Sequence, residues 1–262
     1  MMDLRLNLAV ADGLTSKSQI ARKITEDWAE RNLYCLSCSA DKLVADRAGT
    51  PVQDFTCPAC NTIYQLKSKN GRHGNVVTNS AYCPKITAIR RGAAPNYAFL
   101  GYDRNELIVT NLFVVPGHFL TESIIQKRPP LRPGAHRAGW VGSNILLSRI
   151  PPDGRIAVIL DGVPVEPEVV RIKWERFRFL EKDSRASEGW GADVLAAVRQ
   201  MQSETGRQEF ALQAFYAQFR DLLAERHPAN NNVEARIRRQ LQLLRDNNIL
   251  QFLGRGRYRI IG

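Results

Sequence analysis

The chain has 262 residues and a formal net charge of +11, because its 37 Lys and Arg side chains outnumber 26 Asp and Glu. This length allows one large or two modest domains, at about 150 residues each, and is enough to bury a hydrophobic core. The positive charge favours a polyanionic partner and argues against an acidic, disordered protein. No apolar run approaches the roughly 18 residues that cross a membrane, so a transmembrane protein is excluded and no membrane partner is expected.

The first part of the chain reads as one helix followed by several strands. Residues 15–34 carry apolar side chains near a 3.6-residue period, which predicts a helix. Alternating or β-branched runs predict strands at residues 62–68, 96–102, 106–115 and 155–160. We expect loops where Gly, Asn, Pro and cationic residues gather, at residues 69–80 and 126–144.

The composition changes near residue 183. Strand-like sequence continues to 177–180, and apolar residues at helical spacing dominate afterwards. The spacing predicts helices at 190–202, 209–226 and 232–247, followed by a short hairpin over 249–261. Three helices and a hairpin are the order of a winged helix, which is a variant of the helix-turn-helix. We therefore predict two domains, 1–183 and 184–262, of which the first is α/β.

Four cysteines are spaced like the ligands of a zinc ion. Cys35 and Cys38 form one C-x2-C pair, and Cys57 and Cys60 form a second pair after 18 intervening residues. Four thiolate ligands leave no position for water, so a zinc ion here would be structural. The alternative is four small buried apolar side chains. An odd cysteine count and an N-terminus without a signal-peptide core favour a reducing, cytoplasmic location over a disulfide framework.

A carboxylate, an amide and a lysine surround the second cysteine pair. Gln65 and Lys67 share one face of the predicted strand, and Asp54 joins them if its segment pairs with that strand. Oxygen ligands beside a lysine suit a Mg²⁺ ion that polarises a phosphate and activates water. On spacing alone the alternative is an ordinary amphipathic hairpin with an exposed Lys67.

Several stretches spread over nearly the whole chain are unusual enough to be specific. They are TEDW (25–28), QLKSKNG (65–71), SIIQ (123–126), RAGWVGSNI (137–145), GRIAVILDG (154–162), RRQLQLLRD (238–246) and GRGRYR (254–259). With the two cysteine pairs, they make the chain resemble the DpnI-like type IIM restriction endonucleases of the PD-(D/E)xK superfamily. The resemblance implies a mixed-sheet nuclease domain with a zinc knuckle pair and a C-terminal winged helix. It also implies Mg²⁺-dependent double-strand cleavage of GATC that carries N6-methyladenine.

The superfamily pattern maps onto three residues of this chain. Its catalytic Asp corresponds to Asp54, its metal-binding acid to Gln65 and its lysine to Lys67, so the resemblance implies magnesium at Asp54 and Gln65. Gln65 is a departure, because an amide oxygen can coordinate Mg²⁺ but lacks the negative charge. A non-catalytic reader of methylated DNA with a degenerate nuclease site is therefore the alternative function. A transcription regulator with a zinc ribbon is a more distant one.

The predicted winged helix offers a basic face. Arg238, Arg239 and Gln242 lie on or near the side of helix 232–247 opposite its apolar stripe, where a recognition helix meets the major groove. Arg and Gln side chains are usual partners of guanine and adenine, respectively. Further expected DNA contacts are Asn231 before the helix and Arg255 and Arg257 in the hairpin turn. A solvated basic helix that packs only on its neighbours is the alternative.

Reading an N6-methyl group needs an apolar or aromatic surface. Trp140, which follows Arg137 in the basic segment, is the best candidate, and an ordinary core Trp is the alternative. The expected partner is double-stranded DNA with N6-methyladenine in GATC, bound by a monomeric chain.

Overall fold

The computed structural model describes residues 2–47, 49–50, 52–182 and 189–261. The predicted domain boundary between residues 183 and 184 lies outside these ranges. Within them a mixed seven-stranded sheet has the order β1-β2-β3-β5-β6-β9-β10, in which only the β3–β5 pair is parallel. Its strands are β1 (Val44–Ala45), β2 (Phe55–Thr56), β3 (Ile63–Asn70), β5 (Asn96–Asp103), β6 (Ile108–Val115), β9 (Ile156–Leu160) and β10 (Val163–Pro164). This confirms the predicted α/β class with a mixed sheet.

Each face of this sheet contributes to its own hydrophobic core. On one face, helices α1 (Lys17–Asn32) and α3 (Pro167–Arg176) bury Trp28 and Trp174. Helix α1 forms because its apolar residues recur at helical spacing, as predicted. On the other face, Tyr97 and Phe99 pack into a second core that continues into the C-terminal helices. Because successive side chains of a strand alternate between faces, β5 is buried along nearly its whole length.

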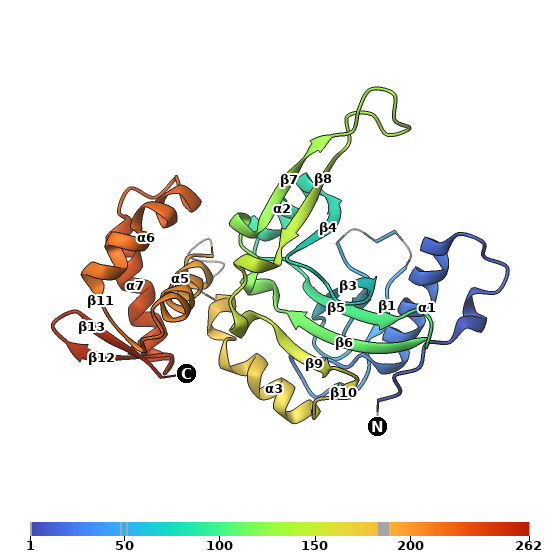
Figure 1. Cartoon of the computed structure of the whole chain (residues 1–262), viewed down its shortest axis with the longest axis horizontal. Helices are drawn as coiled ribbons and strands as arrows, with labels where there is room; N and C mark the ends of the chain where they lie inside the picture. The colour runs from blue at the N-terminus through green and yellow to red at the C-terminus, as the bar shows by residue number, and fades with distance from the viewer. Residues whose placement is uncertain (1, 48, 51, 183–188, 262) are drawn as a thin grey trace.

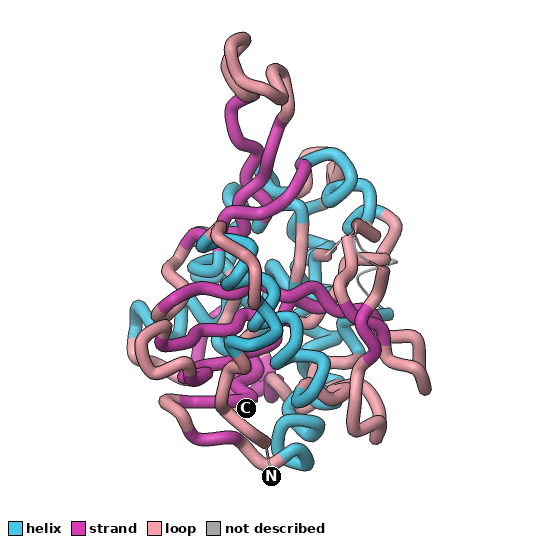
Figure 2. The backbone as a smooth tube through the Cα atoms, turned by 90° about the vertical axis from the view of Figure 1, so that its right-hand side faces the viewer, coloured by secondary structure: helices cyan, strands magenta, loops and turns pink. Residues whose placement is uncertain are grey.

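A second, three-stranded sheet carries a hairpin that projects from the body of the protein (Figures 1 and 2). It contains β4 (Val76–Ala81), β8 (Val141–Leu146) and β7 (Ile125–Pro130), in that order, and α2 (Tyr82–Arg90) follows β4. The prediction of loops over 69–80 and 126–144 is therefore wrong at the ends of both segments. Strands β4 and β7 lack apolar alternation. Backbone pairing with β8, rather than burial of a hydrophobic face, makes these segments strands. Strand β7 lies at the sheet edge, where prolines are tolerated.

The C-terminal part forms the predicted winged helix. Its elements are α5 (Trp190–Thr205), β11 (Glu209–Ala211), α6 (Leu212–Arg226), α7 (Val233–Asp246), β12 (Leu250–Gly254) and β13 (Arg257–Ile260). The predicted helix over 209–226 is wrong in its first turn, because residues 209–211 pair with β13 instead. The strand-like segment 177–180 is also not a strand: a turn at 177–178 precedes a helical stretch from 179 to 182.

Short 3-10 turns complete the fold at Leu8–Ala11, Gly117–Phe119, Glu122–Ile124, Leu147–Arg149 and Pro152–Gly154.

The two parts of the chain share a buried junction. Trp190, only 1% exposed, stacks on His227 with 4.2 Å between the ring centroids, and it shares one hydrophobic core with Phe119 and Ile124 of the first part of the chain. Asp193 of α5 accepts hydrogen bonds from Ser123 Oγ at 3.0 Å and from Arg226 Nη1 at 3.1 Å. The winged helix is thus tied to the first part of the chain by both apolar packing and a buried carboxylate.

Candidate functional site

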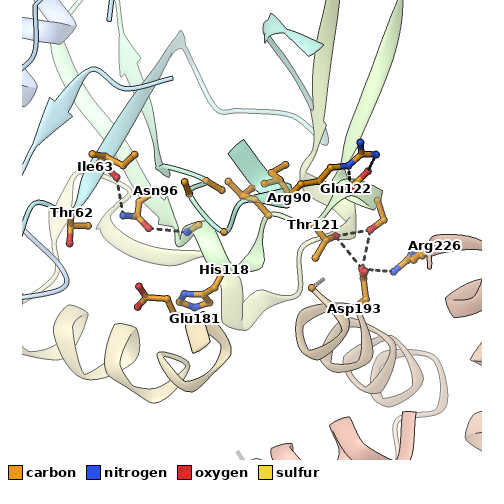
Figure 3. Close-up of a pocket in the computed structure, with 18 of the residues that line it drawn as sticks. Thr62, Ile63, Arg90, Asn96, His118, Thr121, Glu122, Glu181, Asp193 and Arg226 are labelled. Carbon is orange, nitrogen blue, oxygen red and sulfur yellow. Dashed lines mark hydrogen bonds and ion pairs between the residues drawn. The ribbon is translucent and has the colours of Figure 1, made fainter. Parts of the chain in front are cut away.

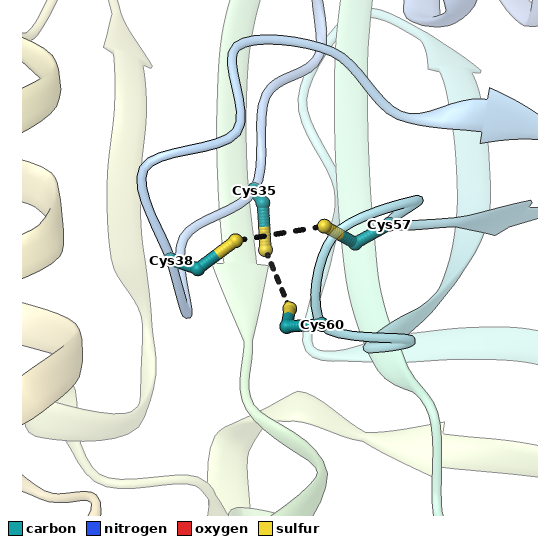
Figure 4. A group of neighbouring side chains, drawn as sticks. All are labelled: Cys35, Cys38, Cys57 and Cys60. Atoms are coloured by element: carbon teal, nitrogen blue, oxygen red, sulfur yellow. Dashed lines mark hydrogen bonds between the residues drawn. The ribbon is translucent and has the colours of Figure 1, made fainter.

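The four cysteines form one cluster between two neighbouring loops (Figure 4). Their sulfur atoms all lie within 4.8 Å of one another, and the Cys35–Cys60 and Cys38–Cys57 Sγ pairs are each 3.6 Å apart. Tetrahedral zinc with Zn–S bonds of about 2.3 Å needs sulfur–sulfur separations of about 3.8 Å. All four are free thiols rather than disulfides. The cluster therefore fits a structural zinc ion.

The surroundings of the cysteines link this cluster to β3. Tyr64 Oη accepts a hydrogen bond from the Leu36 N–H at 3.0 Å and lies 3.4 Å from Cys35 Sγ. Burial raises the pKa of Cys35 to about 12. Burial also acts to raise the pKa of Cys60, but hydrogen bonds with Thr62, Cys57 and Cys38 together outweigh it and lower that pKa to about 6. Since Tyr64 directly precedes Gln65, the cluster supports the strand that carries the predicted nuclease residues.

Asp54, Gln65 and Lys67 come together at an edge of the central sheet. The β2–β3 register pairs Phe55 with Tyr64, which places Asp54 across from Gln65. Strand β2 pairs with only two residues of β3, so the Asp54 side chain can reach the open strand edge. There its Oδ2 accepts a hydrogen bond from the backbone N–H of Leu66 at 2.9 Å.

Lys67 is not the exposed hairpin residue of the alternative interpretation. Its side chain is half-buried beside the Tyr97 ring, with 5.9 Å from Nζ to the ring centroid. Burial lowers the pKa of Lys67, and the opposite charge of Asp54 partly offsets this effect. The lysine and the carboxylate therefore lie within electrostatic reach of each other.

Lys85 on α2 is a member of this site that the sequence interpretation missed. It is 1% exposed, and its Nζ donates a hydrogen bond to Gln65 Oε1 at 2.6 Å. The Nζ also lies 4.9 Å from the centroid of the Tyr97 ring. Burial, helped by repulsion from Lys67, lowers the pKa of Lys85 to about 7. Lys85 lies between Cys83 and Ile86 on a short helix with few other charges. This position was the only signal in the sequence that pointed to a buried lysine.

The projecting hairpin carries Trp140 and Arg137. Trp140 is half-buried and belongs to neither hydrophobic core, which argues against the alternative of a core Trp. The Arg137 guanidinium lies over its ring, with 5.1 Å from Cζ to the ring centroid. A Cβ atom at Gly142 would lie 2.8 Å from two ring atoms of Trp140, so this glycine makes room for the indole.

The predicted DNA contacts of the winged helix lie mostly on exposed surface. Arg238, Arg239 and Gln242 are exposed on α7, away from its buried residues Ile237, Leu241 and Leu244. Asn231 and Arg255 are also exposed, before the helix and at the tip of the wing. Arg257 is exposed as well, but its guanidinium already donates a hydrogen bond to Glu209 at 2.9 Å.

Comparison with known families agrees with these features. Residues 2–183 match the Dam-replacing family (DpnI), and residues 186–260 match the Dam-replacing HTH domain (DpnI_C). The chain belongs to the Dam-replacing (DpnI) family. Membership points to methylation-dependent restriction by a nuclease, and the HTH domain points to DNA binding.

A cavity of this Dam-replacing family member lies elsewhere, at the junction between the two parts of the chain (Figure 3). Its volume is about 650 Å³, and it is lined by His118 and Asn96 on one side and Asp193 and Arg226 on the other. None of the three predicted nuclease residues lines it. Its charges are internally paired, as in the Arg226–Asp193 contact, and burial lowers the pKa of His118 to about 3. The cavity therefore belongs to the junction rather than to the nuclease site.

Within residues 2–47, 49–50, 52–182 and 189–261, no helix combines the length and apolar character needed to cross a membrane.

Proposed function

We propose that this protein is a Mg²⁺-dependent, type II restriction endonuclease that cuts both strands of DNA at GATC containing N6-methyladenine. The observation that carries the proposal is the meeting of Asp54 and Lys67 at one sheet edge, in a chain whose family is one of restriction nucleases. The HTH domain supplies the means of holding duplex DNA. We further propose that a single chain suffices for binding and that it acts in the cytoplasm.

The oxygen atoms at this edge are suitable ligands for one magnesium ion. Asp54 Oδ2 is held by the Leu66 N–H, and its second oxygen remains for a cation. Gln65 Oε1 accepts from Lys85 and retains a second lone pair. A magnesium ion bound by Asp54 and Gln65 would polarise the scissile phosphate and activate a water molecule. The amide carries no charge, so we expect weaker Mg²⁺ binding than at a pair of carboxylates.

Lys67 is the residue that we assign to the phosphate. Its ammonium faces the site beside Asp54, where it would neutralise charge that develops on the phosphate oxygens during attack. It would also orient the attacking water by hydrogen bonding. The burial of this lysine strengthens both effects, because water screens charges less at a partly buried site.

Recognition of the methyl group is assigned to the projecting hairpin and the winged helix. Trp140 presents an aromatic surface outside the cores, and the stacked Arg137 guanidinium can hold phosphate beside it. We assign direct DNA contacts in the second domain to the exposed residues Asn231, Arg238, Arg239, Gln242, Arg255 and Arg257. Arg257 would have to share its guanidinium between Glu209 and DNA.

One observation favours a second candidate, a non-catalytic reader of methylated DNA. Two lysines surround a single carboxylate in the site, and one of them already occupies the Gln65 oxygen. The deciding experiment digests one plasmid, prepared with and without adenine methylation, in the presence of Mg²⁺. Fragments from the methylated plasmid alone support the nuclease. Retained binding without cutting or nicking would leave the reader as the function.

A further inference from the structure

The contact between Lys85 and Gln65 joins two elements on one face of the central sheet. Gln65 lies on β3, and Lys85 lies on α2, which packs over the same face. The 2.6 Å separation of Nζ and Oε1 is that of a short, charge-assisted hydrogen bond. Both side chains are buried, so neither group can readily exchange this partner for bulk water.

The position of Lys85 limits what it can do. Lys85 is 1% exposed, and its Nζ lies 2.6 Å from Gln65 Oε1 and 4.9 Å from the centroid of the Tyr97 ring. Lys67, in contrast, is only half-buried and lies next to Asp54. Lys67 can therefore meet a phosphate group directly, whereas Lys85 can act on the site only through Gln65.

An amide needs an orienting partner where a carboxylate does not. The Gln side chain has one end that accepts hydrogen bonds and one end that only donates them, and the two ends have nearly the same shape. A rotation of 180° about its last bond would turn the NH₂ group towards Lys85 and remove the oxygen ligand. In its ammonium form a lysine can only donate, so protonated Lys85 selects the orientation with Oε1 towards itself. A Glu at this position would present an oxygen in either orientation.

We propose that Lys85 is a positioning residue of the cleavage site, which fixes the orientation of the Gln65 amide by holding one lone pair of Oε1 and leaving the second for a metal ion. A neutral Gln can then serve where the superfamily pattern has an acid. This inference rests on the proposed nuclease function and deepens it. It also implies that residues 65 and 85 work as a pair, so that the effect of changing one depends on the identity of the other.

The test is a double-mutant cycle in the full-length, zinc-loaded chain. Lys85→Met keeps the length and apolar stem of the side chain and removes the donor. We expect it to lower kcat for cleavage of a methylated duplex about tenfold or more, with Kd for the duplex within about threefold of wild type. In the Gln65→Glu background the same substitution should change kcat by less than about twofold. Lys173→Met, on exposed α3, is the matched control for loss of one lysine.

The outcomes separate positioning from a merely structural role. The proposal is supported if Lys85→Met lowers kcat in the chain with Gln65 but not in the Gln65→Glu background. Misfolding would lower activity in both backgrounds. Unchanged kcat in Lys85→Met, or an equal loss in both backgrounds, overturns it. If Lys85→Met lowers Tm and zinc content in both backgrounds, Lys85→Arg takes its place. Cleavage retained by Lys85→Arg then supports the positioning role. A loss of cleavage in Lys85→Arg that Gln65→Glu does not relieve overturns the proposal.

A second readout keeps this inference separate from the proposed function. The side-chain NH₂ resonances of Gln65 can be assigned in ¹⁵N-labelled protein by their loss in Gln65→Glu. We expect them to shift in Lys85→Met and to stay unchanged in Lys173→Met. If wild type cuts no DNA, the proposed nuclease function fails, and the pairing of the two residues is still decided by this spectrum. Resonances that are unmoved by Lys85→Met would overturn the inference.

Discussion

The carboxylate of Asp54 accepts a hydrogen bond from the backbone N–H of Leu66 at 2.9 Å, through Oδ2. Leu66 lies between Gln65 and Lys67, so the same strand carries two predicted nuclease residues and orients the third. A backbone donor cannot change its rotamer, which makes this contact a rigid means of placing the carboxylate. The other carboxylate oxygen is the one that we assign to the proposed magnesium ion.

Removing the charge of Asp54 while keeping its hydrogen bond is expected to abolish cleavage and preserve the fold. Asp54→Asn retains an oxygen that can accept from Leu66, but it loses the negative charge that attracts Mg²⁺. We expect at least about a 100-fold loss of kcat. Binding of methylated duplex should remain within about tenfold, as measured by titration without Mg²⁺. Lys67→Ala should behave alike, and wild-type cutting rates in either variant would refute the catalytic assignment.

One zinc ion per chain is expected at the four cysteines. Metal analysis of protein purified without chelator should find it, and Cys38→Ser should reduce the content and lower Tm. Zinc contributes about 10–16 kcal/mol to folding in small zinc-binding peptides, so its removal should be strongly destabilising. Cys83→Ser is the matched control, because Cys83 is an exposed thiol outside the cluster. Zinc-free protein with wild-type Tm would contradict the assignment.

The basic face of α7 is expected to bind phosphate or base edges of DNA. Each Arg that neutralises a phosphate contributes about 0.9 to the slope of log affinity against log salt concentration. Arg238→Ala and Arg239→Ala should each weaken binding, and each should reduce this slope by about that amount if its contact is to phosphate. Arg178→Ala, on the first part of the chain and paired with Glu175, should leave the slope unchanged. A flat salt profile for wild type would show that this face does not touch DNA.

Trp140 is expected to contribute to methyl discrimination more than to stability. It lies outside both cores, so Trp140→Ala should shift Tm little. An apolar contact with one methyl group is worth about 10- to 200-fold in discrimination. The ratio of cleavage rates on methylated and unmethylated GATC duplexes should therefore fall by a factor in this range. Gly142→Ala should lower the same ratio, because its Cβ would displace the indole. An unchanged ratio in both variants would exclude the indole as a methyl reader.

Gln240 is expected to limit the stability of the winged helix. It is fully buried on α7, and neither atom of its side-chain amide has a hydrogen-bond partner among the described residues. Burying an unpaired polar group costs about 1–3 kcal/mol, so Gln240→Leu should raise the free energy of unfolding by a similar amount. Chemical denaturation measures this change. Gln242→Leu, on the exposed side of the same helix, should leave it nearly unchanged, and destabilisation by Gln240→Leu would reveal an unseen partner.

Local spacing was enough to predict the elements that local interactions define. Helix α1 and the three helices of the C-terminal domain follow from apolar periodicity, which depends only on neighbouring turns. The two C-x2-C pairs predicted one cluster because short loops and a shared metal geometry constrain all four sulfur atoms. The face shared by Gln65 and Lys67 follows likewise from the alternation of a strand.

Contacts between distant segments decided the rest. Residues 209–211 became strand β11 because β13, far along the chain, supplied hydrogen-bond partners that a helical pattern could not reveal. The ends of segment 126–144 became β7 and β8 by pairing with each other and with β4. Lys85 lies 20 residues from Gln65, and only the packing of α2 on the sheet buries its ammonium against that amide. The environment of a lysine depends on the segments packed around it, and short-range periodicity does not predict that packing.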